Sequence, residues 1–552
     1  MEYVKKRLKF FVAITLLGAV ALAFTPPADR YFEIAKNLDI FATLFKEVNA
    51  LYVDDVNPNL LVKTGIDAML ESLDPYTNYI PEDQVEDFRT MNTGQYGGIG
   101  AITRELGDRT VVTMIMEGFA AQKGGLKIGD EIVKINQVEL SNISRREAGN
   151  LMRGQVGEAV TLTVKRIGHE NPIKLEFKRE KIKLNNVPFS GMLDNNIAYI
   201  KLTEFTPDAG KNVRAAFTKL KEKNPKGVVL DLRDNPGGLL MEAVNVCNVF
   251  LPKGKKVVST KGKITDQNAT YSTLDNPLDL EIPVVVLINR GSASASEIVA
   301  GTLQDYDRAI IIGERSFGKG LVQVPRPLSY NAQVKITTAK YYTPTGRCIQ
   351  VLDYTHRRED GSVASIPDSL KNVFKTTNGR TVYDGGGIEP DIQVVQVEAH
   401  PVSQTLFEQG YIFDFSTQYV YNRNSQPDPK SFTLTTEEYQ QFVTWMKGKK
   451  YSYESVIDKQ LIRLGEEAKR ERYYAELKTQ LDQIKSRVEE NKKNELMIYK
   501  DQIKSLLEED IIARYHYERG VVEISFKYDQ DLKKSTEILT NTAQYKKMLN
   551  IH

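Results

Sequence analysis

Hydrophobic residues in the middle of the chain form short continuous runs that alternate with amphipathic segments of helical length. The runs cover residues 197–202, 227–232, 283–288 and 309–312, and the intervening segments cover 207–223, 239–250 and 296–304. Continuous apolar runs of this length are typical of parallel strands buried on both faces of a sheet. The pattern therefore predicts an α/β fold of right-handed βαβ units over residues 186–395.

Different patterns flank this segment on both sides. Residues 30–92 have apolar positions at helical spacing, which predicts an N-terminal helical region. Residues 96–183 change to short strands separated by glycines. Residues 400–552 are charged and helical, and the apolar positions of 477–488 and 498–507 are interpreted as an αα-hairpin with a solvated face. The sequence thus predicts a multi-domain α/β protein with a helical C-terminal extension.

The first 27 residues have the pattern of an export signal. An uncharged run of about 15 apolar residues suits a signal peptide better than a membrane span, which needs about 20. We therefore expect an exported protein, either periplasmic or anchored in the cytoplasmic membrane facing the periplasm. Membrane association through residues 10–24 stays open, because a cleaved and an uncleaved segment would have the same positive flank. The pattern consists of Lys5, Lys6, Arg7 and Lys9, the apolar run 10–24 interrupted by Thr15, and the small-x-small sequence Ala21-Leu22-Ala23.

Length and composition add limits on partners and cofactors. A chain of 552 residues is too long for one ordinary core and predicts several domains. Its 74 basic and 72 acidic residues give a net charge of +2, so we expect no nucleic-acid partner. Cys247 and Cys348 have no CxxC partner, and the five histidines lack ligand spacing. We therefore expect no metal and no cofactor.

The candidate chemistry lies between residues 283 and 323. An apolar strand ends in a turn containing Ser292, Ser294 and Ser296, and a helix follows. Such a turn lies at the carboxyl edge of a parallel sheet, where α/β folds bind their ligands. Taken alone, Ser294 with Glu297 is a capping box, so the local pattern favours helix capping over catalysis. The G-x-S-x-G nucleophile elbow does not match this turn.

The lysine downstream of the turn changes that interpretation. A serine hydroxyl needs a base within hydrogen-bond reach, and no histidine lies between His169 and His356. A lysine can be that base when it is neutral, which burial without a carboxylate partner favours. Lys319 stands among glycine and apolar residues. Gln323 would lie on the same face of an extended strand as Lys319, where it could orient the amine without adding charge.

Residues 96–183 resemble a PDZ domain, most specifically in GLKIGDEIVKIN at residues 125–136. In PDZ domains a glycine-rich loop presents backbone N–H groups to the terminal carboxylate of a peptide, and the peptide adds to an edge strand. The matching loop is Gly97-Gly98-Ile99-Gly100. Its last residue is not aromatic, so the depth of the side-chain pocket is open, and the alternative is that the glycines only form a tight turn.

Four segments resemble the carboxyl-terminal processing (tail-specific) proteases, and the resemblance extends over about residues 35–395. It implies a serine endopeptidase with a spiral αβ core of the crotonase/Clp type and an inserted PDZ domain, acting on proteins with accessible C-terminal tails. By motif position it implies Ser294 as nucleophile, Lys319 as base and Gln323 as its support. It further implies an oxyanion hole from the N–H of Ala295 and of Gly237 or Gly238. The segments are 231–239 (DLRDNPGGL), 289–323, 341–347 (YYTPTGR) and 387–392 (GIEPDI).

Two other functions compete with this interpretation. Ser316 and Lys319 fit the S-x-x-K pattern of penicillin-recognising acyl enzymes, and Lys63-Thr64-Gly65 fits K-T-G. S-x-x-K requires a helix, however, which Gly318 and Gly320 disfavour, and no S-D-N occurs. A catalytically silent PDZ scaffold is the second alternative, against which Ser294, Lys319 and Gln323 argue. The role of residues 400–552 and the formation of a homo-oligomer stay open.

Overall fold

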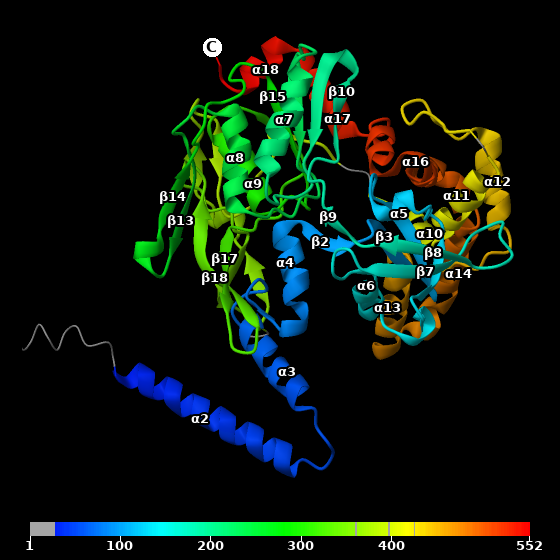
Figure 1. Ribbon diagram of the computed structural model, residues 1–552, viewed down its shortest axis with the longest axis horizontal. Coiled ribbons are helices and arrows are strands. Elements are labelled where there is room, and N and C mark those ends of the chain that lie inside the picture. The colour runs from blue at the N-terminus through cyan, green and yellow to red at the C-terminus, as the bar shows by residue number, and fades with distance from the viewer. Residues whose placement is uncertain (1–27, 359–360, 396–397, 424, 552) are drawn as a thin grey trace, which may run out of the picture. The chain divides into compact units, whose positions relative to one another are not determined.

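The computed structural model describes residues 28–358, 361–395, 398–423 and 425–551 (Figure 1). The chain divides into two compact units, Met1–Tyr79 and Ile80–His552, which are considered separately. The interpretation of residues 1–27 as a signal or anchor lies outside the described residues. Within the described ranges, no helix is both long and apolar enough to cross a membrane.

The first unit contains the helices expected near the N-terminus. They are α2 (Ala28–Leu51) and α3 (Pro58–Glu71), and strand β1 (Asn78–Ile80) follows at the unit boundary. Helix α3 begins where the Asn57 side chain accepts the N–H groups of Asn59 and Leu60, with proline at the first helical position. Leu38, Phe41 and Leu44 of α2 are exposed, so this unit has little core of its own.

The second unit begins with helix α4 (Val85–Thr93), which leads into an antiparallel sheet. The sheet has the strand order β3-β4-β5-β7-β8, so β3 forms one edge. Alternate residues of β7 (Val160, Leu162 and Val164) point into its core, as a strand with one buried face requires. The elements are β2 (Gln95–Gly98), β3 (Ala101–Leu106), β4 (Arg109–Ile115), α5 (Ala120–Lys123), β5 (Glu131–Ile135), β6 (Val138–Glu139), α6 (Arg145–Met152), β7 (Ala159–Lys165), β8 (Ile173–Lys178) and β9 (Glu180–Lys183).

The predicted α/β core is a six-stranded sheet of order β10-β11-β12-β15-β16-β23. Strand β10 is antiparallel to β11, and the other neighbours are parallel. Three helices between the strands make the βαβ connections that the sequence predicts. The elements are β10 (Phe189–Leu193), β11 (Ile197–Lys201), α7 (Ala209–Lys221), β12 (Gly227–Asp231), α8 (Leu240–Phe250), β15 (Val284–Ile288), α9 (Ala295–Asp305), β16 (Ile310–Gly313) and β23 (Ile392–Gln393).

Each face of this sheet has a separate hydrophobic core. Helices α7, α8 and α9 cover the face onto which Ile200 and Val286 project (Figure 1). Tyr199 and Val285, one position away along the same strands, project to the other face, because side chains alternate along a strand. The second face packs against α17 (Gln530–Thr540) and α18 (Thr542–Met548) from the C-terminal end of the chain.

A second sheet of long antiparallel strands lies beside the core. Strand β18 pairs with both β13 and β17, and β14 pairs with β13. Two further hairpins, β19–β20 and β21–β22, follow β18 in the chain. The bounds are β13 (Lys256–Gly262), β14 (Ala269–Ser272), β17 (Leu321–Pro327), β18 (Gln333–Tyr342), β19 (Leu352–Arg357), β20 (Val363–Ser365), β21 (Val373–Lys375) and β22 (Thr381–Tyr383).

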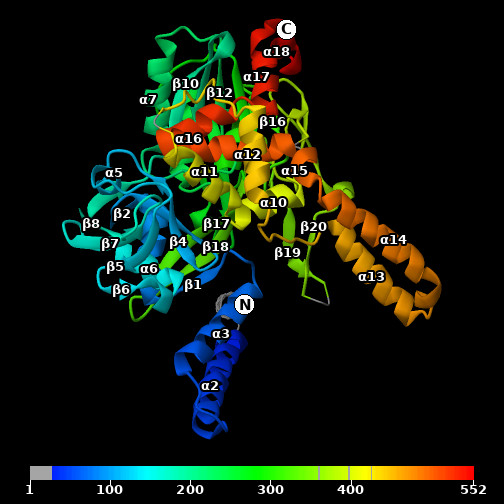
Figure 2. The same ribbon diagram turned by 90° about the vertical axis from the view of Figure 1, so that its right-hand side faces the viewer.

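The C-terminal extension is helical as predicted, but its hairpin differs from the expected one. Helix α14 pairs with α13 (Figure 2), whereas residues 498–507 belong to α15 and α16. The reason is that Ile503 and Leu507 of α16 are buried in a core with α10, α11 and α12, while Leu477 of α14 stays exposed. The bounds are α10 (Pro401–Glu408), α11 (Tyr411–Tyr421), α12 (Thr436–Met446), α13 (Val456–Arg470), α14 (Tyr474–Lys492), α15 (Glu495–Ile498) and α16 (Lys500–Ser525).

Candidate active site

Ser294 occupies a constrained turn between β15 and α9. Its backbone has φ 55° and ψ −111°, a conformation that costs free energy for a residue with a side chain. Gly237 packs directly against this turn, and a Cβ atom at Gly237 would lie 2.8 Å from Ser294 Cβ and from Ala295 N. Only glycine fits this close approach, so the neighbouring loop holds the serine turn in place.

The three serines of the turn have different environments. Ser292 Oγ donates a hydrogen bond to Leu232 O at 2.8 Å, and Ser296 Oγ donates to Asn235 O at 2.8 Å. Both side chains are fully buried. Ser294 is half-buried and lines a cavity of about 1340 Å³. Ser294 is therefore the serine of this turn that a substrate can reach.

Lys319 and Gln323 line the same cavity as Ser294. Gln323 lies on β17, and its Nε2 donates to Thr337 Oγ1 of β18 at 3.2 Å. Lys319 precedes the strand, and the β17–β18 register shifts between Val322 and Gln323. The prediction that one extended face carries both residues is therefore wrong, because a loop and a strand irregularity separate them. The cavity nevertheless receives both side chains.

Glu297 joins the serine turn to the lysine loop. Its carboxylate is fully buried and accepts four hydrogen bonds, one of them from the Ser294 N–H at 2.8 Å. The other three come from the loop before β17: from the Ser316 hydroxyl at 2.5 Å, the Gly318 N–H at 2.7 Å and the Lys319 N–H at 2.9 Å. Burial raises the pKa of Glu297 to about 7 against these hydrogen bonds, which favour the ionised form. The capping interpretation of Glu297 thus covers only one of its four contacts.

We expect Glu297→Gln to lower kcat by about 10- to 100-fold. The glutamine NH₂ group would face backbone N–H groups that bond to a carboxylate oxygen in the unmodified enzyme, and an NH₂ group cannot accept these hydrogen bonds. The variant should also change the pH dependence of stability. The folded state binds the Glu297 proton more tightly than the unfolded state, so stability falls as pH rises from about 4.5 to about 7, by about 3 kcal/mol. Glu297→Gln should remove this fall. Steady-state kinetics and urea unfolding across that pH range measure both effects.

Glu314→Gln is the matched control, because the Glu314 carboxylate forms only a 3.4 Å ion pair with Arg290, whose side chain is 76% exposed. It should leave kcat unchanged. If Glu297→Gln behaves like this control, the four contacts do not organise the site.

The loop after β12 is tied to the serine turn through Asn235. Its Nδ2 donates to Leu202 O at 2.8 Å, and its carbonyl oxygen accepts the Ala293 N–H at 3.0 Å. Its Oδ1 accepts the Gly237 N–H at 2.9 Å. The Gly237 amide is therefore already engaged within the loop.

The amides of Gly238 and Ala295 differ from that of Gly237. Neither donates a hydrogen bond to any residue that the structure describes. Gly238 forms a parallel bridge with Phe205, in which Phe205 N–H bonds to Gly237 O and Leu239 N–H bonds to Phe205 O. The N–H of Gly238 itself therefore points to the side away from Phe205. Both glycines and Ala295 line the cavity.

Histidine and cysteine are missing from the lining of this cavity. Lys319 and Lys335 are its lysines. Cys247 and Cys348 are free thiols. Across the described ranges, no group of three or more His, Cys, Asp or Glu side chains is arranged to hold a metal ion. The side chains of this lining that can accept a proton are therefore the two lysines and the carboxylates of Asp87 and Glu204.

The cavity continues from Ser294 into a groove between β3 and α6. Ala101, Ile102 and Thr103 of the edge strand β3 line one side, and Gly149 and Asn150 of α6 line the other. A Cβ atom at Gly149 would meet no atom within 4 Å, so the groove is open at this point. One continuous cavity thus contains both the serine turn and an unpaired sheet edge.

The four residues of the predicted peptide-binding loop, 97–100, differ in their surroundings. Gly97 and Gly98 belong to β2 and pair with β9. Gly98, Ile99 and Gly100 line the cavity, whereas Gly97 contacts Gly154 instead, its carbonyl oxygen accepting the Gly154 N–H at 3.1 Å. The N–H groups of Ile99 and Gly100 donate to no described residue. These two amides are therefore available at the start of β3.

Comparison with known proteins identifies the family. Residues 196–355 match peptidase family S41, residues 89–165 match the PDZ domain, and residues 402–539 match the C-terminal helical domain of a probable PDZ-protease. A carboxy-terminal-processing protease of Bartonella bacilliformis is 39% identical over 357 residues, which are 63% of this chain and 81% of the relative. The chain belongs to the S41 carboxy-terminal-processing proteases.

Other C-terminal processing proteases are similar over comparable lengths. The carboxy-terminal processing protease CtpA of Bacillus subtilis is 30% identical over 404 residues, which are 71% of this chain and 84% of the relative. The solved photosystem II D1 C-terminal processing protease is 26% identical with a TM-score of 0.35, over 68% of this chain and 96% of that one. The predicted serine endopeptidase with a PDZ domain and a multi-domain α/β fold is confirmed.

The S41 assignment also settles the competing S-x-x-K interpretation. Ser316 lies outside any helix, donates its hydroxyl to Glu297 and accepts the Ile388 N–H at 2.6 Å. A hydroxyl held in this way supports the loop before Lys319 and is not presented to a substrate. Sequence reasoning predicted that residues 400–552 are helical but found no family motif in them, whereas residues 402–539 match the C-terminal helical domain of a probable PDZ-protease.

Proposed function

We propose that this S41 protease uses Ser294 as nucleophile and Lys319 as general base, and that it recognises proteins by their C-terminal tails. The observation that carries the proposal is the single cavity that contains Ser294, Lys319, Gln323 and the β3 edge of the PDZ domain. A tail bound at that edge lies in the same space as the nucleophile. The substrates are accordingly proteins with accessible C-terminal tails, and no cofactor takes part.

In the proposed reaction, the neutral Lys319 amine takes the Ser294 hydroxyl proton while Oγ attacks a peptide carbonyl carbon. The tetrahedral intermediate collapses when the C–N bond breaks and the Lys319 ammonium returns the proton to the leaving amine. An acyl ester on Ser294 remains. Water then attacks this ester, with Lys319 again taking the proton, and releases the carboxylic acid and free serine.

We assign the oxyanion hole to the N–H groups of Ala295 and Gly238. Both amides line the cavity without another hydrogen-bond acceptor among the described residues, whereas the Gly237 N–H is bonded to Asn235. Donors that are fixed before the reaction stabilise the developing negative charge most effectively. The N-terminus of α9 begins at Ala295 and adds its positive dipole end to the same position.

Gln323 has a supporting role in this scheme. Its amide is held by Thr337 and is uncharged, so it can orient the Lys319 amine without stabilising the ammonium form as a carboxylate would.

Tail recognition uses the groove between β3 and α6. The free amides of Ile99 and Gly100 can receive the terminal carboxylate, and the peptide extends the sheet along β3. Phe88, Met91 and Met152 in the lining favour an apolar C-terminal side chain.

A pair of fluorogenic peptides tests tail recognition. The two share one sequence with an apolar last residue and end in either a free carboxylate or an amide. We expect kcat/KM to be about 10- to 100-fold higher for the carboxylate, mainly through KM, because bonds to a charged acceptor are worth about 1.5–3 kcal/mol. Gly149→Leu, which fills the groove, should abolish this preference.

Lys174→Ala, an exposed position on β8 at the opposite edge of the same sheet, should preserve it. Equal turnover of both peptides by the unmodified enzyme would exclude the groove as the tail site.

We also propose that the protease is exported and acts in the periplasm or at the cytoplasmic membrane facing it. The basic and apolar pattern of residues 1–27 supports this location. Mass spectrometry of the N-terminus in the soluble and membrane fractions separates a cleaved signal from an anchor, and a cytoplasmic full-length chain would contradict export. A homo-oligomer remains compatible with this scheme.

A further inference from the structure

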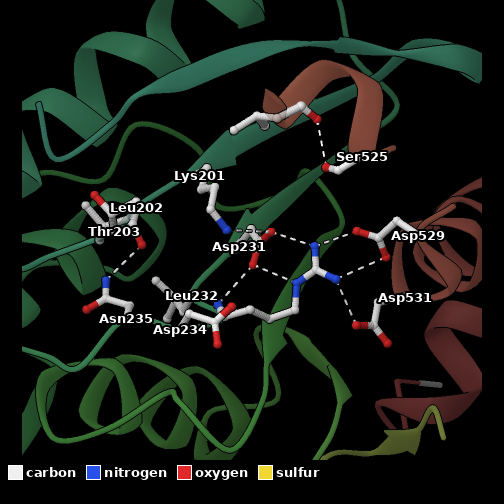
Figure 3. A network of polar contacts seen from close by, with 12 residues as sticks. Lys201, Leu202, Thr203, Asp231, Leu232, Asp234, Asn235, Ser525, Asp529 and Asp531 are labelled. Atoms are coloured by element: carbon white, nitrogen blue, oxygen red, sulfur yellow. Dashed lines mark hydrogen bonds and ion pairs between the residues drawn. The ribbon is translucent and has the colours of Figure 1, made fainter. Parts of the chain in front are cut away.

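Arg233 lies at the centre of a charged cluster that connects the protease core with the C-terminal helical region. Its guanidinium donates two hydrogen bonds to Asp231, at 3.0 and 2.7 Å, and two to Asp529, at 3.0 and 2.6 Å. A fifth, of 2.9 Å, goes to Asp531. In Figure 3, the labelled carboxylates of Asp231, Asp529 and Asp531 surround the unlabelled side chain that these hydrogen bonds identify as Arg233. All five N–H groups of the arginine are therefore used.

The cluster is largely shielded from water. Asp231 and Asp531 are 0% and 1% exposed, and the side chain of Arg233 is 16% exposed. Burial disfavours the charge of Asp231, but the Arg233 and Lys201 cations hold its pKa below the ordinary value. Tyr199 adds a hydrogen bond of 2.6 Å to the same carboxylate. Ion pairs in such surroundings are specific in geometry, and removing one partner leaves the others uncompensated.

On the core side, Arg233 belongs to the loop that ends at Gly238. It stands between Asp231, the last residue of β12, and Asp234, whose N–H donates to Asn289 Oδ1 at 2.9 Å. Asn235 follows and holds the serine turn through Ala293. Fixing the arginine therefore restricts both the loop and the turn that it contacts.

On the other side, the carboxylates belong to the start of α17. Asp529 is the N-cap of this helix and accepts the Leu532 N–H at 3.0 Å. The helix is anchored independently, because Leu532 and Leu539 pack into the second core of the sheet. Tyr545 of α18 accepts the Val284 N–H at 2.9 Å at the start of β15. The helices thus offer a rigid support for Arg233.

We propose that Asp529 and Asp531 are positioning residues for the protease reaction. They hold Arg233 and, through it, the loop whose Gly238 amide completes the oxyanion hole, so the C-terminal helical region takes part in building the active site. This inference rests on the proposed function for the assignment of the oxyanion donors. The end of the C-terminal extension would thus help to hold the loop that ends at Gly238 in place.

The test uses the full chain carrying Asp529→Asn, Asp531→Asn or both. Asparagine is isosteric and caps helices as well as aspartate, so the charge is removed while α17 keeps its N-cap. We expect kcat per folded molecule of the double variant to fall about tenfold or more with KM within twofold. The melting temperature should fall as well, because Arg233 loses two of its three buried carboxylate partners, so kcat is measured at a temperature where the variant is fully folded. Glu537→Gln, which removes an exposed charge from the same helix, is the control and should change neither parameter.

A double-mutant cycle with Arg233→Lys shows whether the aspartates act through the arginine. If they do, combining Arg233→Lys with Asp529→Asn lowers kcat by less than the product of the single effects. Independent, multiplying effects, or unchanged kcat in the double aspartate variant, would overturn the inference. Ser294→Ala is measured in parallel, since turnover that survives in that variant contradicts the proposed function, whereas its loss beside fully active aspartate variants contradicts only the role of α17.

Discussion

Ser294→Ala is expected to lower peptide cleavage by at least about 10⁴-fold, to the background of the assay. Removing the nucleophile from a serine protease leaves only the contribution of substrate binding and oxyanion donors. The fold should be unaffected, because the half-buried Ser294 side chain lines the cavity while Glu297 accepts its backbone N–H, which alanine retains. Cleavage of an unfolded reporter and of the fluorogenic carboxylate peptide, with the melting temperature as a check, measures the effect.

Ser292→Ala is the matched comparison within the same turn. Its buried hydroxyl donates to Leu232 O and accepts the Asn289 N–H at 2.9 Å, so its removal should destabilise the protein by about 1–3 kcal/mol. Turnover per folded molecule should remain within about tenfold of the unmodified enzyme. The opposite result, an inactive Ser292→Ala beside an active Ser294→Ala, would mean that Ser292 and not Ser294 is the nucleophile.

The position of the candidate nucleophile Ser294 in the fold could be predicted from the sequence. A serine at the carboxyl end of a buried strand, followed by a helix, has a predictable place at a sheet edge. The sequence predicted that Glu297 caps the helix at Ser294, which is three residues away. It did not predict that Glu297 also binds the loop of Lys319, because Lys319 is 22 residues away. Long-range contacts of this kind leave no periodic pattern, and the bulge that separates Lys319 from Gln323 leaves none either.

The apolar runs of the core strands indicated that both faces of the sheet are covered, and the sequence analysis did not use this. Continuous apolar runs such as residues 227–232 require cover on both faces of the sheet, and α7, α8 and α9 cover only one. The second cover therefore had to come from elsewhere in the chain. Helical periodicity beyond residue 400 predicted helices, but it could not indicate that Leu532 and Leu539 would supply this cover, because packing partners far apart in sequence share no local pattern.

Lys319→Arg is expected to lower kcat by about 10³-fold or more at neutral pH. Arginine keeps the positive charge and fills a similar volume, but it does not lose a proton in this pH range, so it cannot take the proton of Ser294. A purely electrostatic or packing role for Lys319 would survive this substitution largely intact. Steady-state kinetics with the carboxylate peptide measures the loss, and KM should change little, because the tail groove is untouched.

Lys335→Arg gives the control, since Lys335 is the other lysine that lines the cavity. It should retain turnover, and if it is inactive while Lys319→Arg is active, Lys335 is the base. The double variant Ser294→Ala/Lys319→Arg tests whether Lys319 acts through the Ser294 hydroxyl. Two residues that act as one unit lose their effect together, so the double variant should be no less active than Ser294→Ala alone. Losses that multiply would mean that Lys319 aids catalysis by a route that does not pass through the serine hydroxyl.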